Sequence, residues 1–297
     1  MPKALIVKSL CFLFSRLPLV VIHFAGGVMG LLFYLIPNRV KRTVNTNLKL
    51  CFPDMCPVKR TKLTHRVLAE SSKTVMEMGA VWHWKKEKML AKVQQTTGED
   101  TLTQAMAKGN GVILVLPHLG CWEMIGMYCS SRYPMTSLFR PPRIAGLKNF
   151  ICAARQRFGA KLVPTDVRGV RNLYQSLKNN ELVCILPDQD PGRGNGVFAP
   201  FFGQPAHTMT LLSRLAGKSK ASVIYAYALR LPHGRGYHIH FKAGLDSVHP
   251  DCLTQSATMV NKNIESCIHA SVEQYLWVYK RFKRTPDGCP SCYQHPR

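Results

Sequence analysis

Acidic residues are scarce in this chain of 297 residues, where 16 Asp and Glu stand against 40 Lys and Arg and the formal net charge is +24. So large a positive excess attracts anionic partners, such as nucleic acid, anionic lipid or an acidic protein. The charge selects a class of partner but not one partner within it. Hydrophobic residues make up 46% of the chain. That share can fill a substantial core, which excludes a disordered protein.

The 11 cysteines lack the even number and the regular spacing of a disulfide framework. Free thiols are typical of a reducing compartment, so we expect an intracellular protein. Two groups resemble metal sites, namely His238 with His240, and Cys289 with Cys292 and His295. Neither group offers a convincing fourth ligand, so we predict no metal site.

Charged residues are absent from residues 17–37, LPLVVIHFAGGVMGLLFYLIP. The run is about long enough to cross a hydrocarbon core, and no small-residue cleavage site follows it as in a signal peptide. We expect a membrane anchor over residues 1–42 and one catalytic domain over residues 43–297, since no repeat or low-complexity linker divides the rest. Basic residues flank both ends, so the orientation stays open. A helix in the membrane interface and a buried globular helix are the alternatives.

Short apolar runs alternate with helical patterns along the rest of the chain. Two basic amphipathic helices are expected first, over residues 39–50 and 57–82. The expected strands are 112–116, 135–139, 182–186, 221–230 and 236–243, and the later helices are 120–130, 144–158, 170–178 and a long one within 255–284. This alternation predicts an α/β domain whose sheet is covered by helices on both faces.

No GxSxG elbow occurs, and no Ser or Cys nucleophile has a matching base. The candidate for chemistry is instead His118 with Glu123, in LPHLGCWEMIG. His118 follows an expected strand and a proline, and Gly120 permits a sharp turn before the next helix. Glu123 can then orient one imidazole nitrogen while the other takes a proton from a hydroxyl. A structural histidine with a capping glutamate is the alternative.

The HxxxxE spacing alone is weak, because His65 and Glu70 share it. Five residues on a regular helix leave two side chains about 140° apart, so we expect these two not to touch. Cys121, inside the first motif, has no sign of thiolate stabilisation. We expect it to be a small packed residue.

A second polar group follows the expected strand 182–186, in LPDQDPGRGNGVFAPFFG. Asp188, Asp190 and Arg193 stand there among glycines. A calcium loop would need an acidic residue where Ala199 lies, and a phosphate-cradling GxG loop would need a lysine and a following helix. A solvated turn is the alternative, but the apolar stretch that follows suits an amphiphilic substrate.

Two arginines lie in SLFRPPRIAGL, where Arg140 ends an expected strand and Arg143 precedes an expected helix. An arginine at such a sheet edge can bind a phosphate through two parallel hydrogen bonds. Both side chains can equally be surface charges in a chain with many of them.

Several of these segments together resemble the lipid A biosynthesis acyltransferase family, the late lauroyl/myristoyl transferases of Gram-negative bacteria, within the lysophospholipid acyltransferase superfamily. The likeness rests on an N-terminal hydrophobic helix followed in order by LPHLGCWE, FRPPR, LPDQDPGRGNGVFAPFFGQPA and VEQYLWVYKRFKRTPDG. It implies a glycerolipid-acyltransferase-like central mixed sheet flanked by helices. By this likeness His118 and Glu123 match the catalytic pair, and Arg140 and Asp188 match substrate-binding residues. Cys121 stands where related sequences commonly have asparagine.

The resemblance also implies a reaction. His118, aligned by Glu123, would take a proton from a hydroxyl of a lipid A precursor, which attacks the thioester of an acyl chain on acyl carrier protein. No covalent intermediate, metal or bound cofactor is then needed. The positive charge suits the acidic carrier, the phosphorylated acceptor and an anionic membrane leaflet.

The expected location is the bacterial inner membrane, with the catalytic domain on the cytoplasmic side. An acyl-CoA-dependent glycerolipid or phosphatidylinositol-mannoside acyltransferase is the alternative enzyme. A nucleic-acid-binding module is disfavoured, because the sequence has no RNP-type aromatic pattern, zinc finger or helix-turn-helix signature.

Overall fold

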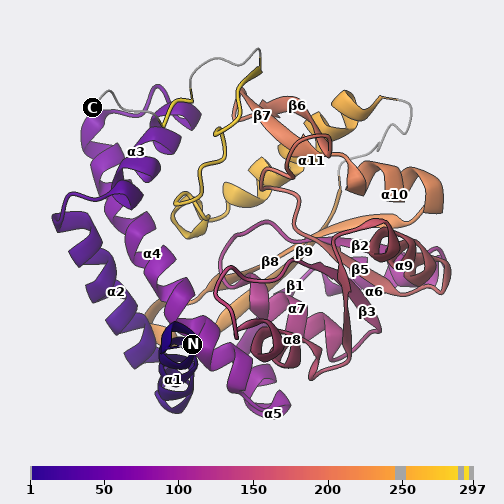
Figure 1. Ribbon diagram of the computed structural model, residues 1–297, viewed down its shortest axis with the longest axis horizontal. Coiled ribbons are helices and arrows are strands. Elements are labelled where there is room, and N and C mark those ends of the chain that lie inside the picture. The colour runs from indigo at the N-terminus through magenta and orange to yellow at the C-terminus, as the bar shows by residue number, and fades with distance from the viewer. Residues whose placement is uncertain (1, 245–251, 287–290, 294–297) are drawn as a thin grey trace.

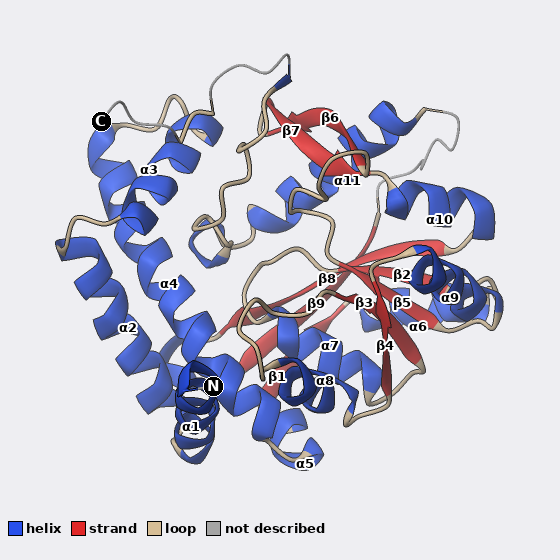
Figure 2. Ribbon diagram, viewed as in Figure 1, coloured by secondary structure: helices blue, strands red, loops and turns tan. Residues whose placement is uncertain are grey.

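The computed structural model describes residues 2–244, 252–286 and 291–293, and these residues form a central seven-stranded sheet in the order β1-β9-β8-β2-β5-β3-β4 (Figures 1 and 2). Strands β8 and β9 are antiparallel, and the other neighbouring pairs are parallel. The predicted α/β fold with a mixed central sheet is therefore confirmed. The strands are β1 (Val93–Thr97), β2 (Val112–Val115), β3 (Met135–Phe139), β4 (Ala160–Pro164), β5 (Leu182–Ile185), β8 (Ser222–Arg230) and β9 (Tyr237–Ala243).

Both faces of the sheet are covered, as the uniformly apolar central strands require. Along β2, Val112 and Leu114 join one hydrophobic cluster, while Ile113 and Val115 join the other, and all four side chains are fully buried. The first cluster includes side chains of α6 (Glu99–Ala107) and α7 (Trp122–Ser130). The second includes side chains of α9 (Val167–Lys178), α10 (Leu211–Ser219) and α11 (Leu253–Ile268).

The N-terminal segment forms a helical layer beside the sheet, in which α1 and α2 pack on α4 (Figure 1). Its helices are α1 (Pro2–Arg16), α2 (Leu19–Leu35), α3 (Arg39–Cys51), α4 (Pro57–His83) and α5 (Lys86–Leu90). The contact between α2 and α4 is close, because a Cβ atom on Gly30 would lie 2.3 Å from the Cα atom of Ala69. Glycine at this position lets the two helix backbones approach.

The predicted transmembrane helix is not confirmed. Residues 17–37 give α2, which has 17 residues, and α3 follows at an angle of 85°. In the described parts of the chain no single helix is long and apolar enough to cross a membrane, although α2 and α3 as a bent pair satisfy length and composition. Most of the exposed large hydrophobic side chains nevertheless lie on α1 and α2, and Phe24 is 73% exposed. The predicted domain boundary after residue 42 falls inside α3.

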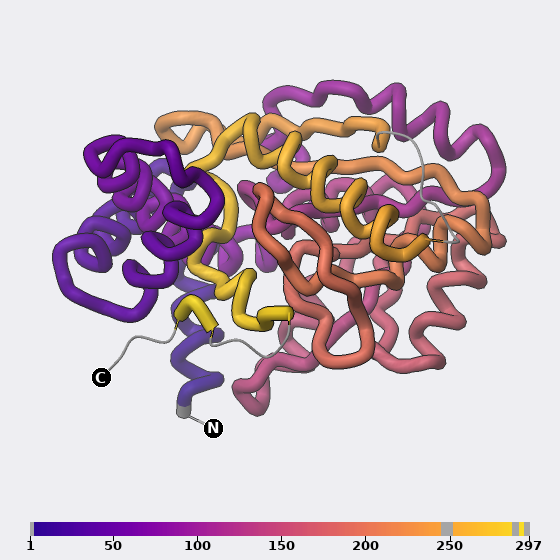
Figure 3. Tube along the Cα trace, turned by 90° about the horizontal axis from the view of Figure 1, so that it is seen from above, coloured from indigo at the N-terminus to yellow at the C-terminus, as the bar shows by residue number. Residues whose placement is uncertain are grey.

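Some elements differ from the prediction. Strands β1 and β4 and the hairpin of β6 (Gly196–Phe201) and β7 (Gln204–Met209) were not predicted, and α8 (Lys148–Gln156) is shorter than expected. The long terminal helix expected within residues 255–284 is α11, which ends at Ile268, and a short 3-10 turn, η2 (Val272–Gln274), follows it. Figure 3 shows the C-terminal segment running beside the β6–β7 hairpin instead.

Candidate active site

His118 lies in a tight loop between β2 and α7, as the sequence predicted. Gly120 has a φ of +62°, and a Cβ atom there would lie 1.9 Å from the carbonyl oxygen of Ala228. Only glycine fits this close approach. The loop is fixed by backbone hydrogen bonds to β8 and to the C-terminal segment, from Cys121 N to Ala228 O at 2.9 Å and from Leu276 N to His118 O at 3.0 Å. The imidazole is therefore presented by a rigid backbone.

Asp188 holds both the ring and the backbone of His118. Its Oδ1 atom lies 2.7 Å from Nδ1 of the imidazole, and its Oδ2 atom accepts a hydrogen bond of 2.8 Å from the backbone N–H of His118. The Asp188 side chain is 1% exposed. Burial by itself would raise its pKa, but the charge of His118 and these hydrogen bonds outweigh burial, so the pKa of Asp188 lies below its usual value. Asp188 is therefore a carboxylate that accepts a hydrogen bond from Nδ1–H of His118.

The structure does not place Glu123 on the imidazole of His118, as the sequence analysis expected. Instead, Glu123 Oε2 accepts hydrogen bonds of 3.0 Å from Trp82 Nε1 and from Arg155 Nε, and Oε1 pairs with Arg155 Nη2. Burial would raise the pKa of Glu123, but the charge and hydrogen bonds of Arg155 hold it below its usual value. Asp188, 70 positions from His118 in the chain, occupies the role expected of Glu123.

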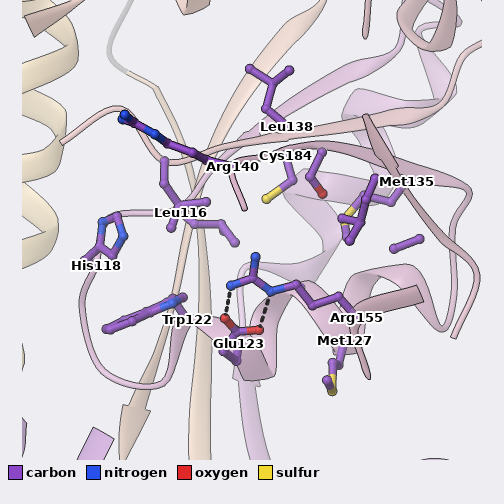
Figure 4. Close-up of a pocket in the computed structure, with 15 residues that line it drawn as sticks. Leu116, His118, Trp122, Glu123, Met127, Met135, Leu138, Arg140, Arg155 and Cys184 are labelled. Carbon is purple, nitrogen blue, oxygen red and sulfur yellow. Dashed lines mark hydrogen bonds and ion pairs between the residues drawn. The ribbon is translucent and has the colours of Figure 1, made fainter. Parts of the chain in front are cut away.

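A pocket of about 270 Å³ brings His118, Glu123, Arg140 and Arg155 to one site, although Asp188 is not among the residues that line it (Figure 4). The remaining walls are mostly apolar, and they include Leu116, Trp122, Met127, Met135, Leu138, Ala160, Leu162, Cys184 and Leu186. In Figure 4 the Arg140 side chain extends away from the Glu123–Arg155 pair. The pocket thus has a charged part next to His118 and a hydrophobic part beyond it, an arrangement that suits an amphiphilic ligand.

Arg140, the predicted anion ligand, is exposed and makes no ion pair within the described chain. Its neighbour Arg143 is also exposed. Cys121 is 1% exposed, so the prediction of a small packed residue is confirmed, and burial raises the pKa of its thiol well above the usual value. His65 packs against Tyr34, with ring centroids 5.2 Å apart.

The sequence did not indicate three residues of the site, namely Arg155, Trp82 and Gln189. Gln189 Nε2 lies 3.2 Å from His118 Nε2, on the side of the ring opposite Asp188. Arg155 and Trp82 reach Glu123 from α8 and α4, at sequence separations of 32 and 41. No local pattern marks such distant partners, although Gln189 follows Asp188 directly.

The two metal-like groups lead to no site on the described residues, among which no three His, Cys, Asp or Glu side chains gather as metal ligands do. The rings of His238 and His240 lie 3.9 Å apart, and His238 bonds Thr97. Cys289 and His295 lie outside the described residues.

The chain is similar to one family model and to several known acyltransferases. A family model described as bacterial lipid A biosynthesis acyltransferase matches residues 3–284. The lipid A biosynthesis lauroyltransferase of Escherichia coli (strain K12) is 30% identical over 95% of this chain and 92% of its own length. The lipid A biosynthesis palmitoleoyltransferase of the same strain is 29% identical over 95% and 91%. The phosphatidylinositol mannoside acyltransferase of Mycobacterium tuberculosis (strain H37Rv) is 29% identical, over 48% of this chain and 46% of its own.

Proposed function

The chain belongs to the bacterial lipid A biosynthesis acyltransferase family, a family of acyltransferases, and from this premise we propose that it moves a fatty acyl chain from an acyl carrier protein thioester to a hydroxyl of a lipid A precursor. The observation that carries the proposal is the Asp188-held imidazole of His118 beside an apolar pocket. The geometry supplies a base at a fixed position and a place for the acyl chain, which are the two needs of direct acyl transfer.

His118 acts as the general base. Because the Asp188 carboxylate accepts a hydrogen bond from Nδ1–H, Nε2 is left as the proton acceptor, and the amide of Gln189 at 3.2 Å occupies the position that a substrate hydroxyl would take. Nε2 removes the hydroxyl proton as the oxygen forms a bond to the thioester carbonyl carbon. The carbon–sulfur bond then breaks, and the imidazolium returns the proton to the departing thiolate. A thiol pKa of about 8.5 makes it a good leaving group, so no covalent enzyme intermediate is needed.

Glu123 contributes through Arg155. It holds Nε and Nη2 of the guanidinium, and in Figure 4 the third nitrogen points away from Glu123 toward the apolar part of the pocket. A fixed cation at this place stabilises the negative charge that develops on the thioester oxygen in the transition state. Glu123 is thus a positioning residue for Arg155, and Arg140, across the pocket, takes the acceptor or donor phosphate.

The surface of α1 and α2 supports a proposed association with a membrane. Exposed side chains such as Leu5, Phe24 and Leu35 offer apolar area, and basic residues occur at both ends of the segment. Such a surface inserts into an anionic leaflet. We place the protein on the cytoplasmic side of the bacterial inner membrane, where the carrier-protein thioester is available.

Membrane binding can be measured by co-sedimentation with vesicles that contain anionic phospholipid. Phe24→Asp should reduce the bound fraction, because Phe24 is 73% exposed on α2. Val167→Asp is the matched control, since Val167 is 76% exposed on α9. Equal binding of the two variants would show that the surface of α2 is not the one that contacts lipid.

The proposed reaction is tested by mass spectrometry of lipid A from a strain that lacks the gene. We expect lipid A with one acyl chain fewer, restored by the wild-type gene. The purified protein should use acyl carrier protein thioesters in preference to acyl-CoA. An unchanged acyl number together with acyl-CoA-dependent acylation of a glycerolipid or phosphatidylinositol mannoside would replace this proposal with the alternative.

A further inference from the structure

A second pocket, of about 370 Å³, lies beside the loop that carries Asp188. It is formed by the glycine-rich segment before β6, by β6 and β7, and by the C-terminal segment. Its lining includes Arg193, Phe198, His207, Lys283 and Arg284. The lining is therefore rich in cations, in contrast with the mainly apolar walls of the pocket at His118.

One carboxylate organises these cations. The Asp190 side chain is 1% exposed, and its Oδ2 atom lies 2.8 Å from Arg284 Nε and 3.8 Å from Lys283 Nζ. His207 Nδ1 lies 3.4 Å from Asp190 Oδ1. Burial would raise the pKa of Asp190, but hydrogen bonds from the Gly192 N–H and Arg284, and the charges nearby, hold it below its usual value. Asp190 is thus a buried anion that positions two basic side chains at the pocket.

The charge of Asp190 leaves a positive excess. Lys283 and Arg284 are 42% and 34% exposed, so both reach the solvent side of the pocket. Arg193 is exposed, and its side chain makes no hydrogen bond or ion pair to any residue that the structure describes. Three cations around one carboxylate leave a net positive site. Guanidinium groups bind phosphate oxygens through paired hydrogen bonds.

This pocket is connected to His118 by consecutive residues. Asp188 holds the imidazole, Gln189 contacts its Nε2, and Asp190 holds Arg284. Arg193 follows Gln189 by four residues, so their Cα atoms are at most about 14 Å apart. A ligand with a reacting group at His118 and an anionic group up to about this distance away would reach both pockets.

We propose that Arg193, Lys283 and Arg284 form a subsite for a phosphate ester of a substrate whose reacting group lies at His118. The subsite rests on the proposed acyl transfer, because that reaction supplies two such esters. One is a phosphate on the glycolipid acceptor, and the other is the phosphodiester that joins the pantetheine arm to the carrier protein. Either ester would fix its substrate relative to the base.

Arg193→Gln tests the subsite, since an exposed and unpaired arginine can be replaced without loss of fold. Arg171→Gln is the matched control, because Arg171 is an exposed arginine on α9. We expect the KM for one substrate to rise about tenfold in Arg193→Gln, the loss of roughly one charge-assisted hydrogen bond. kcat should change little, and Arg171→Gln should match the wild type.

Two comparisons distinguish the sources of the ester. If the acceptor provides it, Arg193→Gln raises the KM of the phosphorylated acceptor but not that of an acceptor treated with phosphatase. If the donor provides it, Arg193→Gln raises the KM of acyl carrier protein thioester but not that of an acyl-N-acetylcysteamine thioester. Unchanged KM values for every substrate would overturn the proposal.

A binding measurement separates this proposal from the proposed function. Inorganic phosphate added to the full-length protein should show broadening of its phosphorus NMR signal, reduced in Arg193→Gln and retained in Arg171→Gln. If the full-length protein broadens the phosphate signal but transfers no acyl chain, the anion subsite is supported and the proposed acyl transfer is contradicted. Equal broadening in both variants would remove the subsite.

Discussion

Two buried glutamates of this protein each pair with an arginine, yet their surroundings differ. Glu77 and Arg230 form an almost fully buried pair, with side chains 0% and 3% exposed. Glu123 is 6% exposed, but its partner Arg155 is 34% exposed and lines the pocket at His118. The same pair of functional groups therefore occurs once with its arginine almost fully buried and once with its arginine partly exposed at the pocket of His118.

The buried pair, Glu77 and Arg230, forms its hydrogen bonds with other groups of the protein. Glu77 Oε2 accepts from Tyr237 Oη at 2.9 Å and lies 2.9 Å from His23 Nε2, while Arg230 Nη2 donates to the Gly120 carbonyl at 3.1 Å. Burial would raise the pKa of Glu77, but Arg230 and His23 hold it at about 2. These bonds join α2, α4, β8 and β9 to the loop of His118. The pair of Glu123 and Arg155 keeps one guanidinium nitrogen directed away from its glutamate. We infer that the exposure of Arg155 beside His118 suits it to catalysis, whereas the buried Arg230 supports the fold.

Arg230→Met is the change with the largest expected effect. It removes the arginine that pairs with the buried Glu77 carboxylate, which costs about 3–5 kcal/mol in the free energy of unfolding. The melting temperature should fall by roughly 10 °C in a chain of this size. Arg235→Met is the control, because Arg235 is exposed and, among the described residues, its guanidinium bonds only the carbonyl of Pro232. Similar melting temperatures for the two variants would contradict the structural role of the buried pair of Glu77 and Arg230.

Arg155→Gln should act on the rate instead of the fold. We expect kcat for acyl transfer to fall on the order of 100-fold, the loss of one group that stabilises the oxyanion. The melting temperature should change far less than in Arg230→Met. If Glu123 acts through Arg155, the double variant with Glu123→Gln should be no slower than Arg155→Gln alone. Rate losses that multiply in the double variant would show that Glu123 has a separate role.

Gly126→Leu tests the apolar part of the pocket at His118. Gly126 lies on α7, lines the pocket, and would have no atom within 4 Å of an added Cβ. A leucine there should occupy the space of an acyl chain and shift selectivity toward shorter chains about tenfold. Competition between thioesters of two lengths, read by mass spectrometry, measures the shift. Gly27→Leu on α2 is the control, and an equal effect there would exclude a pocket origin.

His240 gives the smallest effect and shows what burial does without an opposite charge. Burial, and then the charge of His238, lower the pKa of His240 to about 4 from an unfolded value of 6.5. Below pH 6.5 the unfolded chain binds this proton more readily, so stability falls as the pH drops toward 4. His240→Phe should recover on the order of 1 kcal/mol at pH 4.5 and nothing at pH 8. Denaturant unfolding at both pH values measures this, and an equal change at each would exclude titration of His240.

The sequence predicted which strand ends form the site, but it did not predict which side chains contact each other there. Pro117 and Pro187 each follow an apolar strand and precede a polar residue, which located His118 and Asp188. Their pairing depends on β2 and β5 being neighbours in the sheet, and strand order is a property of the whole fold. Glu123 is close to His118 in sequence and was therefore expected to be its partner. Local spacing could not reveal that a distant arginine already holds it.

The missed strands share a physical reason. β1 and β4 are at the two edges of the sheet, and β1, VQQTT, has four exposed residues in a row. Edge strands lose the apolar pattern that identifies central ones. A long helix was expected within residues 255–284, and α11 occupies the first part of that range. After Ile268 the chain leaves the helix to contact β7, where Arg281 Nη1 donates to the His207 carbonyl at 2.6 Å. That tertiary contact overrides helical spacing.

The rate of acyl transfer by purified His118→Ala, compared with His65→Ala, tests the central proposal most directly. Both changes remove one imidazole, but only His118 is held by Asp188 at the pocket. With acyl carrier protein thioester and a lipid A precursor, His118→Ala should lose at least about 100-fold in kcat at an unchanged melting temperature, while His65→Ala should keep the wild-type rate. A folded His118→Ala protein that transfers the acyl chain at the wild-type rate would contradict the proposed base.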